Sequence, residues 1–276
     1  MAQLATDPAD ILRQIGESGD GPHDIAHTAL MLAAFDHAGC ELAPYEGHLG
    51  EIAESAIREA RLATHAEDVA RALSALMVGR FGYDGDRLTY DDPKNADLIS
   101  VIDRRRGMPV ALGILYIHAA RAAGFEACGL NSPGHFLLRL DVRGSHALID
   151  PFNGGAALDR ERLGAPPAMS ASSPDDPQIA EPVSDVEVLL RLQNNLKLRA
   201  LNSGNRQRAL EIARRMTLIA PKKAELWMDL ARLNEGSGSL GAATRAYETC
   251  LTLVQPGVAL HNEAALGLHA LKRRLH

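Results

Sequence analysis

One stretch of the chain, residues 109–123, is apolar on nearly every side of the helix that it would form. Pro109 suits the first turn of that helix, where its missing N–H would have no partner in any case, and Gly124 suits its end. A helix without a polar face has to be buried on all sides. The rest of the chain must therefore enclose this segment, which predicts a globular fold around one central helix.

The composition agrees with a globular fold. Of the 276 residues, 46% are hydrophobic and 23% are charged, which argues against disorder. The net charge of -6 gives no basic footprint for nucleic acid or an anionic membrane. The most apolar run, residues 110–117, is too short to span a bilayer. We therefore expect neither a nucleic-acid partner nor a membrane partner.

The three cysteines, Cys40, Cys128 and Cys250, lie far apart and form no Cys-x-x-Cys pair, which argues against structural zinc. Their odd, sparse count fits a reducing compartment. The first ten residues carry acids and lack the pattern of a secretion signal. The histidines are scattered, with no spacing typical of metal ligands. We expect a cytoplasmic protein without a metal or another cofactor.

Helices are predicted before the central helix in the sequence, and strands are predicted after it. Residues 7–82 have apolar positions at helical spacing. A further helix should begin at Pro93, and Gly107 suits its left-handed stop. After the central helix, three short strands are expected at residues 125–130, 135–142 and 146–150.

Two residues with catalytic chemistry fall on this expected hairpin. With a turn near Gly144, antiparallel pairing places His135 and Asp150 at the same end of the sheet. An imidazole oriented by a carboxylate is the base half of a nucleophilic triad. The alternative interpretation is a structural hydrogen bond at the sheet end, which an isolated pair of this kind favours.

The C-terminal part repeats itself. Residues 164–185, rich in Pro, Ala and Ser, predict a linker or a mobile flap. After them, a sequence pattern recurs at a spacing of 34 residues, and Trp227 and Tyr247 occupy positions of the tetratricopeptide template. This repeat is typical of tetratricopeptide helices. We predict that these helices hold a protein or peptide partner, with Trp227 and Tyr247 as possible contacts. Alternatively, they merely pack on the middle domain.

The middle motifs resemble the transglutaminase-like core, in which a Gly-x-Cys opens a helix that ends in Arg-x-x-Gly. Here the corresponding segments are Gly107-Met108-Pro109, Arg121-Ala-Ala-Gly124, His135-Phe136 and Ile149-Asp150. Together with Tyr90-Asp-Asp-Pro-Lys-Asn95 and Asp150-Pro-Phe-Asn-Gly-Gly155, they resemble a bacterial subgroup that joins this core to tetratricopeptide helices. That subgroup is named after a proposed regulator of invasion genes. The resemblance implies a mostly helical α+β fold: a papain-like core with a small antiparallel sheet, flanked by N-terminal helices and C-terminal helical hairpins.

The resemblance transfers only part of the catalytic set. His135 matches the family's catalytic histidine and Asp150 its orienting aspartate. Counting back from Arg121 and from Gly124 places the nucleophilic cysteine at position 109, which is proline. Cys128, the only thiol in this core, falls inside an expected strand and is interpreted as a small buried hydrophobic residue.

We therefore predict a pseudoenzyme that acts as a binding or regulatory module. Its expected regions are N-terminal helices at 1–89, the core at 90–163, a linker at 164–184 and repeats at 185–276. Two alternatives stay open. One is a hydrolase of altered mechanism that uses His135 and Asp150 to activate water or an outside nucleophile, and the other is a purely structural adaptor.

Overall fold

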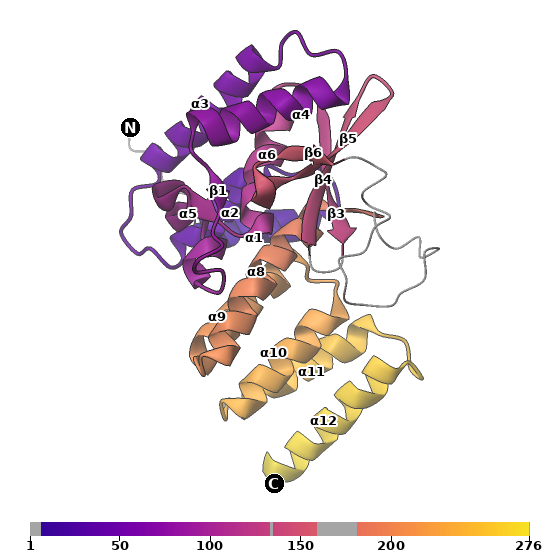
Figure 1. Ribbon diagram of the computed structural model, residues 1–276. Helices are drawn as coiled ribbons and strands as arrows, with labels where there is room; N and C mark the ends of the chain where they lie inside the picture. The colour runs from indigo at the N-terminus through magenta and orange to yellow at the C-terminus, as the bar shows by residue number, and fades with distance from the viewer. Residues whose placement is uncertain (1–6, 133–134, 159–180, 276) are drawn as a thin grey trace, which may run out of the picture. The chain divides into compact units, whose positions relative to one another are not determined.

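The computed structural model describes residues 7–132, 135–158 and 181–275. Its contacts divide the chain into two compact units, Asp20–Leu189 and a second unit that joins Met1–Gly19 to Leu190–His276. Figure 1 shows the helices and the sheet of the first unit and the helical hairpins of the second. The predicted α+β, mostly helical fold is confirmed. The division into four regions stays a proposal.

The larger unit surrounds one buried helix. Its helices are α2 (Ile25–Ala34), α3 (Ala43–Glu59), α4 (Ala66–Ser74), the π-turn η1 (Ala75–Arg80), the 3-10 turn η2 (Pro93–Ala96), α5 (Leu98–Arg104) and α6 (Pro109–Ala122). Every residue from Val110 to Ile117 in α6 is buried. Helices α2, α3, α4 and α5 and strands β3 and β4 all contact α6, which explains why it has no polar face.

The sheet has five antiparallel strands in the order β6-β5-β4-β3-β7. They are β3 (Glu126–Ser132), β4 (His135–Val142), β5 (Ser145–Asp150), β6 (Ala156–Leu158) and β7 (Glu181–Val183). The three central strands match the expected hairpins, and β6 and β7 extend the sheet at its edges. Val183 of β7 pairs with Gly129 of β3, so residues that were expected in the linker form a strand at the edge of the sheet. Most of that expected linker, residues 164–180, lies outside the described residues.

Two glycines let α6 approach the sheet closely. A Cβ on Gly113 of α6 would lie 2.7 Å from the Cδ1 atom of Phe136, and one on Gly129 of β3 would lie 2.8 Å from its Cζ atom. The Phe136 ring, only 1% exposed, thus fills a space that both glycines leave open. Because Phe136 is the second residue of β4, this contact sets the first turns of α6 against the start of that strand.

A short parallel ribbon leads into α6. It pairs β1 (Asp84–Gly85) with β2 (Arg106–Gly107). The expected left-handed stop at Gly107 is wrong, because that conformation belongs to Arg105, with φ 54°. The expected helix from Pro93 is also interrupted: Asp97 accepts a hydrogen bond from the Ser100 backbone N–H at 2.7 Å and so caps a separate helix, α5.

The second unit is a set of helical hairpins. Its helices are α1 (Pro8–Ser18), the part of α8 (Asp185–Asn202) from Leu190 onward, α9 (Arg206–Ile219), α10 (Ala224–Gly236), α11 (Leu240–Leu253) and α12 (Ala259–Leu275). Lys197 of α8 pairs with Asp229 of α10 at 2.6 Å. Arg232 of α10 pairs with Glu263 of α12 at 2.8 Å. No helix in the described ranges is long and apolar enough to cross a membrane.

Candidate functional site: the start of α6 and the sheet end beside it

Pro109 is the first residue of α6, preceded by Met108, which makes no side-chain capping hydrogen bond. In a thiol enzyme, a cysteine here would profit from the positive end of the helix dipole. Here the same position carries a pyrrolidine ring. The three thiols lie elsewhere: Cys40 precedes α3, Cys128 is in β3 and Cys250 is in α11.

The register of the sheet places the backbones of His135 and Asp150 at one end. Strand β4 begins at His135 and β5 ends at Asp150. Leu138 pairs with Ile149, so by extension Asp150 lies across from Leu137, two residues from His135. The structure describes the backbone of His135 and not its side chain, so the hydrogen bond between His135 and Asp150 stays a prediction.

The carboxylate of Asp150 closes a turn. It is 7% exposed and begins the 3-10 turn η3 (Pro151–Asn153). Its Oδ1 atom accepts from the backbone N–H groups of Phe152 at 3.0 Å and Asn153 at 3.2 Å, and its Oδ2 atom accepts from the Asn153 amide at 2.6 Å. A carboxylate offers about four acceptor sites, so these three bonds leave room for one more. The carboxylate of Asp150 thus stabilises the turn at η3, and these bonds do not require an imidazole partner.

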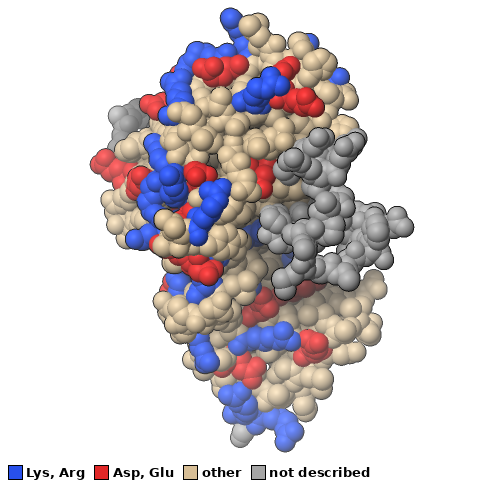
Figure 2. Space-filling view, viewed as in Figure 1, with Lys and Arg blue, Asp and Glu red and all other residues tan. Residues whose placement is uncertain are grey.

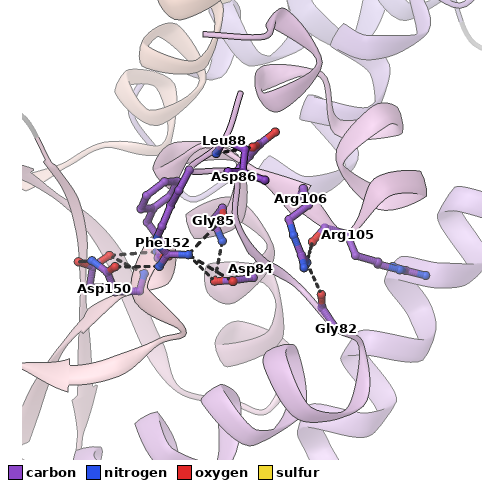
Figure 3. A network of polar contacts seen from close by, with 11 residues as sticks. Gly82, Asp84, Gly85, Asp86, Leu88, Arg105, Arg106, Asp150 and Phe152 are labelled. Carbon is purple, nitrogen blue, oxygen red and sulfur yellow. Dashed lines mark hydrogen bonds and ion pairs between the residues drawn. The ribbon is translucent and has the colours of Figure 1, made fainter. Parts of the chain in front are cut away.

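Figure 3 shows Phe152 of this turn beside Gly85 of the ribbon before α6, and Arg87 ties the turn to the ribbon. Its guanidinium donates to the Phe152 carbonyl and to Asn153 Oδ1, both at 2.9 Å, and to Asp84 of β1 at 3.2 Å. It also lies 5.1 Å from the centre of the Phe152 ring. Since β1 pairs with β2, which leads directly into Pro109, these contacts hold η3 and the ribbon before α6 together. Sequence reasoning missed Arg87, because nothing in its local pattern signals a partner 65 residues away.

A buried tyrosine faces the same turn from α6. Tyr116 is 1% exposed, and its hydroxyl has no hydrogen-bond partner in the part of the chain that the structure describes. Burial, with smaller effects from the charges of Asp84 and Asp150, raises the pKa of Tyr116, so the hydroxyl stays neutral. Gly155, at φ 69°, lets the chain pass so close that a Cβ would lie 2.6 Å from the Tyr116 ring.

Cys128 is poorly suited to act as a nucleophile. It lies in β3, and burial raises the pKa of its thiol, while the charges of Arg139 and Asp141 act in opposite directions. Because the thiolate is the reactive form, a raised pKa makes this side chain less reactive at neutral pH.

The two residues proposed for partner binding are engaged within the repeats. The indole N–H of Trp227 donates to the Pro221 carbonyl at 2.7 Å. Tyr247 is 3% exposed and donates to Glu235 at 3.1 Å. Gly267 of α12 packs against the Tyr247 ring. Their role in partner binding stays a prediction, and both side chains shape the repeats from within.

Comparison with known proteins identifies the family. Residues 43–194, more than half of the chain, match the Transglutaminase-like superfamily. The chain belongs to that superfamily. Residues 196–276 of this transglutaminase-like protein match the Tetratricopeptide repeat family. Both resemblances seen in the sequence are therefore confirmed.

Relatives of this transglutaminase-like protein include bacterial proteins. A UPF0162 protein from Xylella fastidiosa is 36% identical over 183 residues, which cover 63% of this chain and 65% of that relative. A UPF0162 protein from Vibrio cholerae is 37% identical over 36% of this chain and 38% of the relative. The mouse F-box only protein 21 is 30% identical over 30% of this chain and 13% of its own length.

A solved structure of menin, described as revealing the binding site for the Mixed Lineage Leukemia protein, shares the fold. Its TM-score is 0.51 at 12% identity, over 97% of this chain and 65% of that chain. At this identity the likeness shows the fold alone.

Proposed function

We propose that this chain is a non-catalytic member of the transglutaminase-like superfamily that binds a protein or peptide partner through its tetratricopeptide helices. The observation that carries this proposal is Pro109 at the first position of α6, where the family's nucleophile is expected. A helix start can lower the pKa of a thiol only where a thiol is present. The surrounding helices and sheet then serve to maintain the fold and to present surfaces for binding.

Two further observations support partner binding. Tetratricopeptide helices generally mediate contacts between proteins, and the helices here present large apolar side chains to solvent, with Leu253 of α11 38% and Leu266 of α12 71% exposed. Menin, which shares the fold, is described as having a binding site for another protein. The three free cysteines fit a reducing compartment, so we also propose a cytoplasmic location.

The first test concerns chemistry. An electrophilic thiol probe at neutral pH should label Cys128 slowly in the native protein, because burial raises the pKa of that thiol. A panel of amide and ester substrates should show no turnover that depends on a thiol. A Pro109→Cys variant, with its thiol at the helix start, should be labelled about tenfold faster than Cys128. Rapid labelling of Cys128, with turnover that disappears in Cys128→Ser, would contradict the proposal.

The second test concerns the partner. A photoreactive amino acid at position 266, exposed on α12, should crosslink a specific protein when the full chain is placed in extract of its source cells. The matched control is position 57 on α3, where Ile57 is also an exposed apolar residue. If both positions capture the same proteins in the same amounts, the repeats hold no specific partner and the proposal is wrong.

A further inference from the structure

The Asp20–Leu189 unit also contains a concavity that none of the residues proposed for catalysis lines. It has a volume of about 590 Å³ and lies between α3, the loop before it and the C-terminal end of α5. We call it the α3–α5 pocket. Its charged and polar lining comprises Glu41, Tyr45, His48, Glu51, Asp103 and Arg105. Figure 3 shows the side chain of Arg105 directed away from Asp150.

The single cation of the lining is held by the protein itself. Arg105 has a left-handed backbone (φ 54°), a conformation uncommon for a residue with a side chain. Its guanidinium lies 4.9 Å from the centre of the Tyr83 ring. Its Nη1 atom donates to the Tyr83 hydroxyl at 2.5 Å and also to His48 Nε2. The Nη1 atom and one face of the Arg105 guanidinium are therefore engaged by residues of the protein itself.

These contacts also fix the charge state of His48. A guanidinium can only donate, so Nε2 of His48 must accept, and the ring proton lies on Nδ1. Burial, reinforced by the charge of Arg105, lowers the pKa of His48, in agreement with a neutral ring. The protonated Nδ1 lies 3.7 Å from a carboxylate oxygen of Glu51 at the pocket mouth. His48 therefore adds no positive charge to the pocket.

The remaining lining is acidic and aromatic. Tyr45 donates to Asp103 at 3.1 Å. Burial, together with this bond and the charge of Asp103, raises the pKa of Tyr45 to about 12, so its ring forms a neutral wall. Three carboxylates, of Glu41, Glu51 and Asp103, face one guanidinium, which leaves the lining with a net charge of minus two. An anion would be repelled here, whereas a cation would find hydrogen-bond acceptors and an aromatic face.

We propose that the α3–α5 pocket binds an organic cation that carries ammonium or guanidinium groups. Its volume falls within the range of small-ligand sites, and its three carboxylates suit a ligand with several N–H donors. Such a cation could be a free polyamine or a basic side chain of a bound protein. The proposal goes beyond partner binding by the repeats, because every residue of the pocket belongs to the Asp20–Leu189 unit.

Calorimetric titration of the full chain at low salt tests the proposal with two probes, spermidine and a short capped peptide rich in arginine and lysine. Saturable binding of spermidine alone would identify a polyamine site, and binding of the peptide alone would identify a side-chain site; either supports the proposal. Glu51→Gln and Asp103→Asn should each weaken binding by about three- to fivefold, and together by about tenfold. Both residues are exposed, so these variants should fold.

Glu59→Gln is the matched control, because this exposed carboxylate on α3 lies outside the pocket. It should leave the affinity unchanged. The proposal is overturned if neither probe gives saturable binding, or if Glu59→Gln weakens binding as much as Glu51→Gln. It is also overturned if inorganic phosphate binds more tightly than both cations, since Arg105 would then act as an anion site.

Discussion

Replacing Arg121 with alanine is expected to lower the free energy of unfolding by about 3–5 kcal/mol, because it leaves a buried carboxylate without its cation. The Nη1 and Nη2 atoms of Arg121 donate to Asp185 at 2.6 and 2.9 Å, a bidentate pair in which the aspartate side chain is only 4% exposed. Arg121 also donates to the Ala127 carbonyl at 2.9 Å and so joins the end of α6 to β3. Chemical denaturation of the full chain measures the loss.

The matched control is Arg71→Ala, which removes an exposed arginine paired with Asp68 at 3.1 Å. It should cost no more than about 1 kcal/mol, as exposed ion pairs usually do. The double variant Arg121→Ala/Asp185→Asn should lose less than the sum of its two single changes, because the second change removes the stranded charge. A loss for Arg121→Ala no larger than that of Arg71→Ala would show that the pair does not stabilise the fold.

This pair gives a physical meaning to a motif that the sequence offered only by resemblance. In the family pattern, Arg121 marks the place from which position 109 is counted. The structure adds that Asp185, 64 residues further along the chain, fixes its guanidinium. No local pattern could reveal that partner. An aspartate at the start of a helix usually indicates a helix cap, and nothing in the sequence around Asp185 indicates burial or a distant arginine.

Periodicity predicted the elements well and their junctions poorly. The apolar run of α6 and the alternation of β4 each had one physical solution, a helix buried on all sides and a half-buried strand. Gly107 misled because a glycine after basic residues usually ends a helix, whereas here it pairs with Gly85 in a parallel ribbon. That pairing joins segments distant in sequence, so local signals could not show it.

The candidate site was predictable in its positions and not in its interactions. Counting residues from the expected hairpin turn near Gly144 places Asp150 near the start of β4, and the register of the strands agrees. The bonds of Asp150 to Phe152 and Asn153 and the clamp by Arg87 were not foreseen, because they depend on a tight turn whose geometry only the folded chain defines. The α3–α5 pocket likewise joins residues from two helices that periodicity treats separately.

Replacing Gly113 with alanine should destabilise the protein, although alanine is the better helix former. The new Cβ would lie 2.7 Å from the Cδ1 atom of Phe136, inside contact distance of a ring that is 1% exposed. The ring has little room to move, because Gly129 bounds it on the other side. Overpacking of this kind typically costs about 1–3 kcal/mol. The upper part of that range exceeds the gain of about 1 kcal/mol in helix propensity from replacing glycine with alanine.

Gly50→Ala on α3 is the matched control, since a Cβ there meets no atom within 4 Å. It should raise the free energy of unfolding by about 0.5–1 kcal/mol, so the two substitutions should differ in sign. Adding Phe136→Leu to Gly113→Ala should recover part of the loss, because the smaller side chain makes room for the methyl group. If Gly113→Ala stabilises the protein as Gly50→Ala does, α6 does not approach β4 this closely, and Pro109 would then lie further from the sheet end that carries Asp150.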